Sequence, residues 1–145
     1  METSREAQIE RFQRAFFTLF KKLGPELGLP DHITLTGPQT MMLYTISQMG
    51  PCPAGKLAGK MEVTPSAITV MIDRLVQNGF VERKHDELDR RIVLLQATDK
   101  GKEVLKELNK LRTAAIHTYL SHVEADELEL FLTTFEKKLL KKIEE

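Results

Sequence analysis

The sequence predicts a mainly α-helical fold that carries one small antiparallel β-hairpin. Apolar residues recur at three- and four-residue intervals near both ends of the chain, which is the spacing of amphipathic helices. In the middle, two further helical patterns are separated by a turn of about three residues, the connection length of a helix-turn-helix. A short alternating run and a charged turn follow directly, and they predict the hairpin.

Length and composition indicate a single folded domain. The chain has 145 residues, of which 41% are hydrophobic and 29% charged, so it has enough apolar material for one core. Lys plus Arg and Asp plus Glu balance at 21 each, so nucleic-acid binding would depend on where the cations lie rather than on their number. The single cysteine excludes an internal disulfide, and no apolar leader or membrane-length apolar run is present. We therefore expect a cytoplasmic protein without membrane partners.

Two helices are expected before the helix-turn-helix. The first covers residues 4–23, and Gly24-Pro25 ends it. Its apolar stripe consists of Ile9, Phe12, Phe16, Leu19 and Leu23. The second opens at Thr36-Gly37-Pro38, where Thr36 is a suitable N-cap, and Gly50-Pro51-Cys52-Pro53 ends it.

The helix-turn-helix begins with a helix expected over residues 54–61. Its second helix starts at Thr64-Pro65, because threonine is a good N-cap and proline has no N–H to leave unpaired at the first helical position. Asn78-Gly79 ends this helix, since both residue types tolerate the left-handed conformation. Helical spacing assigns two faces to it. The inward face is expected to hold Ala67, Ile68, Met71 and Leu75, and the outward face Pro65, Ser66, Thr69, Val70 and Asp73.

The hairpin and two further helices complete the chain. Phe80 to His85 alternates, residues 86–89 are turn-like, and Ile92 to Leu95 suits a second strand. Thr98-Asp99 then caps a long helix that reaches about His122, and a final helix follows a break at residues 123–126. The terminal helices carry more apolar stripe than the central lobe can cover, so we expect them to pack against each other and against a second copy. The alternative is a monomer whose ends fold back on its own core.

A helix-turn-helix followed by a hairpin is a winged helix-turn-helix, and here the chain resembles the MarR family of transcriptional regulators. The resemblance runs through VTPSAITVMIDRLVQNGFVERKHDELDRRIVLLQATDKG, and its most specific residues are Asp89-Arg90-Arg91 followed by Thr98 and Gly101. It extends over the whole chain in the order and length of the helices. It implies one domain over residues 1–145, with a winged helix-turn-helix DNA-binding lobe at 36–97 and dimerisation helices at 1–30 and 99–145.

The resemblance also implies how double-stranded DNA would be bound. The second helix of the motif enters the major groove, while the hairpin, or wing, places Arg91 in the minor groove and Asp89 holds that arginine by a charge-assisted hydrogen bond. Many family members carry arginine where this chain has Pro65 or Val70, so we expect fewer polar base contacts and more dependence on DNA shape. The residues expected to bind DNA are Thr64, Pro65, Ser66, Thr69, Val70, Arg83, Lys84, Asp89, Arg90 and Arg91.

These assignments have plainer alternatives. Ser66 and Thr69 could be ordinary solvated helix residues. The wing could instead hold a surface ion-pair network, because four acids match its four cations in number. These acids are Glu82, Asp86, Glu87 and Asp89.

A small-molecule effector, often aromatic or phenolic, is a further implication of the resemblance. It would lie in a cleft between the dimer helices and the DNA-binding lobe. The candidate lining residues are Phe16, Phe17, Phe20, Met41, Met42 and Tyr44, although core packing is the simpler role for any one of them. Cys52 and four histidines leave a redox- or metal-sensing alternative, but no group of residues has metal-ligand spacing. We expect no metal and no cofactor.

The sequence contains no nucleophile–base set, Gly-rich phosphate loop or HExxH motif, so we expect no enzyme. The resulting interpretation is a homodimeric, sequence-specific DNA-binding regulator. We expect a repressor that binds a pseudo-palindromic operator and is released by a small ligand. Zero net charge, Pro65 and Val70 leave a winged-helix protein–protein interaction module as the alternative.

Overall fold

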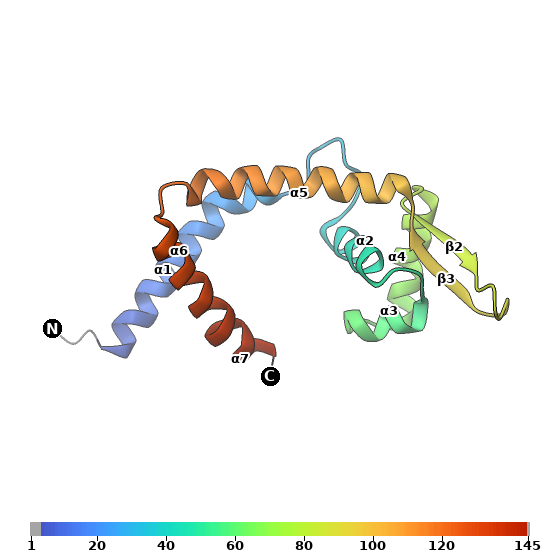
Figure 1. The fold of residues 1–145 in the computed structure, drawn as a ribbon, viewed down its shortest axis with the longest axis horizontal. Helices are drawn as coiled ribbons and strands as arrows, with labels where there is room; N and C mark the ends of the chain where they lie inside the picture. Colours follow the sequence, from blue (N-terminus) through green and yellow to red (C-terminus); the bar gives the residue numbers. More distant parts are fainter. Residues whose placement is uncertain (1–3, 145) are drawn as a thin grey trace. The chain divides into compact units, whose positions relative to one another are not determined.

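The computed structural model describes residues 4–144 and confirms a mainly helical fold with a small antiparallel sheet (Figure 1). Residues 1–3 and 145 lie outside the described part of the chain. The helices are α1 (Arg5–Leu23), α2 (Gly37–Met49), α3 (Ala54–Met61), α4 (Pro65–Gln77), α5 (Asp99–Leu120), α6 (Ala125–Thr134) and α7 (Lys141–Glu144). The short segments are the 3-10 helix η1 (Gly24–Leu27) and the π-helix η2 (Phe135–Leu140). The strands are β1 (Cys52–Pro53), β2 (Val81–His85) and β3 (Val93–Ala97).

The chain divides into two compact units. One consists of the two ends of the chain, up to Gly28 and from Leu111 onward, and the other of Leu29–Lys110. The central unit contains α2, α3, α4 and the whole sheet. It is longer at both ends than the lobe expected at 36–97, and the functional boundaries of that lobe stay a prediction.

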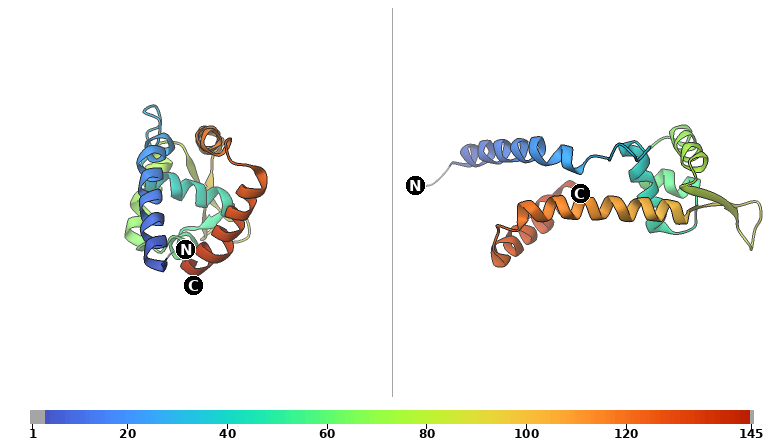
Figure 2. Two further views of the ribbon diagram at one scale, coloured as in Figure 1. Left: turned by 90° about the vertical axis from the view of Figure 1, so that its left-hand side faces the viewer. Right: turned by 90° about the horizontal axis from the view of Figure 1, so that it is seen from above.

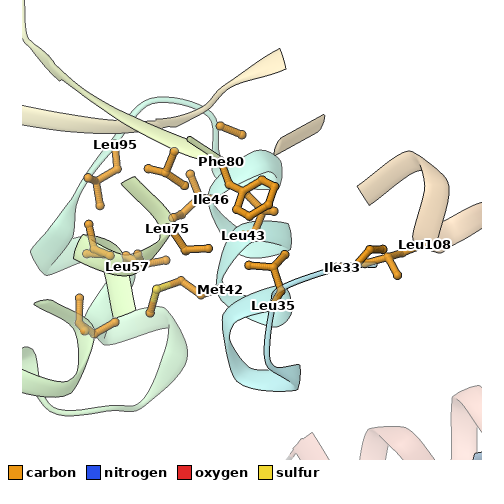
Figure 3. Close-up of a cluster of buried hydrophobic side chains, with 14 residues drawn as sticks. Ile33, Leu35, Met42, Leu43, Ile46, Leu57, Leu75, Phe80, Leu95 and Leu108 are labelled. Carbon is orange, nitrogen blue, oxygen red and sulfur yellow. The ribbon is translucent and has the colours of Figure 1, made fainter. Parts of the chain in front are cut away.

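The core of the central unit forms from residues of α2, α3 and α4 and of the sheet (Figure 3). Leu43 and Ile46 of α2, Leu57 of α3 and Leu75 of α4 are fully buried there. Side chains of this size each stabilise a fold by about 1.5–3 kcal/mol when they leave water. This shared core holds the two helices of the helix-turn-helix in one arrangement.

The buried face of α4 differs from the predicted one. Ile68, Ile72 and Leu75 are buried and follow the four- and three-residue steps of one helical stripe. Ala67, which was expected inward, is exposed, because it precedes Ile68 by one residue and so lies about 100° away around the helix. Ile72 is the residue that takes its place in the core.

The sheet has the strand order β1-β3-β2, and both pairings are antiparallel. β2 and β3 pair from Val81 with Ala97 at the base to His85 with Val93 at the far end. Val81 and Ala97 are buried, whereas the rest of β2 is exposed. The alternation expected over residues 80–85 therefore gives no buried face, because the hairpin leaves the core after its first pair. Figures 1 and 2 show it projecting beyond α4.

One polar side chain and two glycines shape the junction between the end of α4 and the start of α5. Gly79 takes the left-handed conformation (φ 78°) that turns the chain out of α4, while Asn78 stays right-handed. The Thr98 hydroxyl donates to the Gly79 carbonyl oxygen at 2.6 Å and accepts from the Gly101 N–H at 3.1 Å, which makes Thr98 the expected cap of α5. A Cβ on Gly101 would collide with the Phe80 carbonyl oxygen.

The unit formed by the chain ends has a different character. None of the residues of α1, α6, η2 or α7 that the structure describes is buried. Phe12, Phe16 and Phe20 stack along α1 with ring centroids 6.1 and 6.5 Å apart. The expected final helix is present as α6, η2 and α7, and its middle is π-helical rather than α-helical.

Helix length and apolar content bear on membrane insertion. Across the described residues, no helix combines enough length with enough apolar character to cross a bilayer.

Candidate nucleic-acid interface

The turn between α3 and α4 sets the position of the predicted reading helix. Glu62 ends α3 in the left-handed conformation (φ 54°), which lets the chain reverse within the short turn. Thr64 caps α4 as expected, because its hydroxyl oxygen accepts from the Ala67 N–H at 3.3 Å. The sequence offered no sign of the left-handed Glu62, since glutamate rarely takes this conformation.

The outward face of α4 is exposed at every expected position. The Thr69 hydroxyl donates to the Pro65 carbonyl oxygen at 2.9 Å, so its oxygen remains available as an acceptor. The Ser66 hydroxyl lies 3.3 Å from the Thr64 hydroxyl and has no partner beyond it among the described residues. Val70 is 56% exposed and presents an apolar surface of the kind that packs on a thymine methyl group.

At the wing tip, Asp89 holds Arg91 through both side chain and backbone. Arg91 Nε donates to Asp89 Oδ1 and Nη2 to Oδ2, each at 3.0 Å, and the Arg91 backbone N–H donates to Oδ1 at 3.1 Å. These hydrogen bonds lower the pKa of Asp89 and raise that of Arg91. The Arg91 side chain nevertheless remains 91% exposed. It is a cation that is oriented but still open to solvent.

Other short contacts order the loop that carries these residues. The Asp86 N–H donates to the Ile92 carbonyl and the Ile92 N–H to the Asp89 carbonyl, each at 3.0 Å. The Asp86 carboxylate accepts from the Leu88 N–H at 2.8 Å. His85 Nδ1 lies 2.8 Å from the Arg90 carbonyl oxygen and donates to it. Asp86 and His85 were not expected to support the tip, although Asp is a residue type that accepts hydrogen bonds in turns.

The wing cations are not neutralised by the wing acids as a group. Of the four expected acids, only Asp89 forms an ion pair with a residue that the structure describes, and its partner is Arg91. Lys84 and Arg90 have no ion pair within residues 4–144. Arg83 is paired, but with Asp73 on α4 rather than with an acid of the wing. The lobe thus presents three wing cations toward solvent, one of them held in place.

The residues expected around an effector cleft lie in different places. Phe16 and Phe20 line an open cavity of about 580 Å³, together with Leu19, Leu23 and η1. Met42 is fully buried in the core of the central unit, where ordinary packing accounts for it. Phe17, Met41 and Tyr44 are exposed, Phe17 on α1 and the other two on α2.

Cys52 and the histidines offer little for redox or metal chemistry. Cys52 is buried in β1 opposite Leu95, and this burial raises the pKa of its thiol although Lys56 acts to lower it. A raised pKa makes a thiol less reactive. His32 pairs with Glu107 at 2.6 Å. No three His, Cys, Asp or Glu side chains gather as metal ligands anywhere in the described chain.

Known proteins match the chain in sequence and in structure. The family model described as MarR family matches residues 35–93. The HTH-type transcriptional repressor MdtR of Bacillus subtilis (strain 168) is 34% identical over 117 residues, which is 80% of this chain and 76% of that protein. The YusO protein from Bacillus subtilis has 30% identity, covering 96% of this chain and 99% of its own, with a TM-score of 0.76. A MarR family protein from Bacillus stearothermophilus has 25% identity, covering 100% and 99%, with a TM-score of 0.79.

The helix-turn-helix and the hairpin directly after it define a winged helix-turn-helix protein. With these matches, the chain belongs to the MarR family of transcriptional regulators. This family is made of regulators rather than enzymes, so the protein is a regulator of transcription and not an enzyme.

Proposed function

We propose that the protein is a homodimeric repressor that reads a pseudo-palindromic DNA operator through α4 and the wing. The observation that carries this proposal is the ordered but exposed Arg91 at the tip of a hairpin beside the outward face of α4. A narrow hairpin tip suits the minor groove, whose negative potential attracts arginine. The exposed face of α4 suits the adjacent major groove.

Relatives support DNA binding and repression. MdtR, at 34% identity, is named a transcriptional repressor. A mutant MarR from E. coli was solved with operator DNA, and FabT of Streptococcus pneumoniae was solved with DNA. These two proteins share 24% and 18% identity with this chain and TM-scores of 0.64 and 0.73. At these identities the two structures support only the fold of the lobe. The assignment of DNA-binding residues depends on the geometry of this chain.

The homodimer is supported by the apolar side chains that the chain ends leave uncovered. Phe12, Phe16 and Phe20 of α1 are 55%, 53% and 68% exposed. Leu130, Phe131 and Ile143 in α6 and α7 are also largely exposed. Helices of this kind gain most of their stability from packing an apolar face, and a second copy would supply a matching one. Two wings and two α4 helices then require half-sites about 10 bp apart.

DNA binding is tested by fluorescence anisotropy with duplexes from the promoter region of the protein's own gene. We expect the logarithm of the affinity to fall linearly with the logarithm of salt, by about 0.9 for each phosphate neutralised. A duplex of the same composition and scrambled order is the control, and it should bind more weakly. Equal binding to both duplexes would reject sequence-specific reading, and a flat salt response would reject direct DNA reading. No affinity for either duplex would favour a protein–protein module.

Release by a small ligand is the second part of the proposal. The cavity beside Phe16 and Phe20 supports it, because its walls are mostly apolar and its volume falls within the range of small-molecule sites. A MepR-like protein, 43% identical with a TM-score of 0.55, was solved with pseudoligands. A ligand releases DNA only if it has the higher affinity for the form of the protein that does not fit the operator.

The ligand is tested with simple aromatic carboxylates and phenols, and cyclohexane carboxylate serves as the matched aliphatic probe. We expect an aromatic probe to weaken operator binding and the Leu27→Ala variant, which alters the cavity outside the stacked row of α1, to resist that probe. If no probe changes operator affinity in the wild-type protein, release by this class of ligand is rejected while DNA binding stands.

A further inference from the structure

One ion pair links the two elements that are proposed to read DNA. Arg83 Nη2 of β2 donates to Asp73 Oδ1 of α4, across the turn that separates helix and wing. The Arg83 and Asp73 side chains are 43% and 51% exposed. Both therefore lie on the surface of the central unit rather than in its core.

Asp73 occupies the outward face of α4, where it is the one acidic residue among the five expected positions. An unpaired carboxylate on this face would repel the phosphates of DNA. Arg83 supplies the compensating charge, and the pair has no net charge. Arg91 differs, because its acidic partner lies within its own loop and its side chain is 91% exposed.

We propose that Asp73 and Arg83 form a neutral brace that fixes the base of the wing to α4 and withholds Arg83 from phosphate binding. Asp73 is then a positioning residue, and Arg83 is removed from the set of predicted DNA contacts. The brace sets the angle between the element in the major groove and the element in the minor groove. This inference rests on the proposed function, because it concerns how the same surface discriminates between DNA sequences.

The dependence of affinity on salt can count the cations that meet phosphates. Each such contact contributes about 0.9 to the slope of log affinity against log salt. Asp73→Asn frees Arg83, so we expect a steeper slope and tighter binding to scrambled DNA. The double variant D73N/R83Q removes both charges at once. If Arg83 does not contact phosphate, this variant keeps the wild-type slope.

The double variant also removes the brace, so it should discriminate less well between operator and scrambled duplex. Exposed ion pairs are worth up to about 1 kcal/mol, which converts to an operator preference up to about fivefold lower. A merely structural ion pair would instead lower stability and leave both the slope of D73N and the operator preference unchanged. Urea unfolding of each variant confirms that it is folded at the temperature of the binding assay.

The matched control is the same exchange at the wing tip, D89N/R91Q. Its slope should fall by about 0.9 per protomer, because Arg91 is proposed to meet the DNA. The brace is overturned if D73N/R83Q loses slope as D89N/R91Q does, or if D73N leaves slope and operator preference unchanged. A flat slope in the wild-type protein would instead reject the proposed function itself.

Discussion

Arg91 is the residue on which the proposed reading of DNA depends most. Its guanidinium is fixed at two nitrogen atoms by Asp89, yet its side chain remains open to solvent. An arginine that is already ordered loses less conformational entropy on binding than a free one. The family resemblance implied this pair, and the structure shows the hydrogen bonds on which that role would rest.

Replacing Arg91 with alanine should weaken operator binding by about ten- to a hundredfold. The loss arises because the wing tip no longer brings a cation into the minor groove. Fluorescence anisotropy on the operator duplex measures this loss of affinity. The matched control is Lys138→Ala, which removes one cation from the chain-end unit and should leave operator affinity unchanged. Equal affinities for the wild type and Arg91→Ala would remove the wing tip from the interface.

Asp89 should titrate below its ordinary pKa of 3.8, because Arg91 stabilises its ionised form. A group with a lowered pKa contributes its interaction above its unfolded pKa and loses it as the pH falls through the folded pKa. The contact between Asp89 and Arg91 should therefore persist from neutral pH to below pH 4. Carboxyl NMR of the wild type and of Arg91→Gln checks this, since the pKa should rise toward 3.8 in the variant. An unchanged pKa in the variant would contradict the contact.

At the scale of the elements, the junction between α4 and α5 explains why Gly101 is part of the motif. The Phe80 carbonyl approaches Gly101 so closely that no side chain fits, and the Thr98 hydroxyl connects the same two segments. Lys100 adds a hydrogen bond to the Asn78 carbonyl at 2.8 Å and lies 4.8 Å from the Phe80 ring centroid. The start of α5 is thereby fixed to the base of the wing.

Gly101→Ala should destabilise the protein by about 1–3 kcal/mol, because the new methyl group forces the backbone apart. Gly59→Ala is the matched control. Gly59 lies inside α3, and apart from its chain neighbours and the helix's own backbone no atom lies within 4 Å of an added Cβ, so the same exchange should stabilise by about 0.5–1 kcal/mol. Urea unfolding of the two variants should give changes of opposite sign. A neutral Gly101→Ala would contradict the close approach.

Local signals in the sequence predicted the helices well. α3 covers residues 54–61 as expected, because Pro53 before it and Thr64-Pro65 after it are strong boundary residues. Thr36 and Gln39 form a reciprocal capping pair at the start of α2, where Thr36 was predicted as the cap. These features depend on residues three or four positions apart, which is the range that sequence patterns describe.

Contacts between distant residues could not be predicted in the same way. β1 is a strand only because Cys52 and Pro53 pair with β3, more than 40 residues later. Asp73 and Arg83 meet across a turn whose geometry the sequence does not specify. The π-helical turn in the final helix also left no trace in the apolar spacing. These are the features that tertiary packing decides.

At the scale of the whole molecule, the exposed apolar stripe of α1 predicts assembly. Phe16→Glu places a charge in the stacked row of Phe12, Phe16 and Phe20, so it should convert a dimer into a monomer and strongly weaken operator binding. Thr18→Glu adds the same charge at an exposed position on the opposite side of α1 and should leave the dimer intact. Sedimentation velocity at several concentrations measures both. A monomeric wild type would reject the homodimer.

The middle position of β3 in the sheet bears on whether the sheets of neighbouring copies can pair edge to edge. Because β3 is paired on both flanks, the sheet ends in β1, which is two residues long and includes a proline, and in β2. Adjacent Glu82, Arg83 and Lys84 put charge along β2, and charged residues discourage pairing with another strand edge. The charges of β2 and the shortness of β1 therefore discourage neighbouring copies from extending the sheet at either edge.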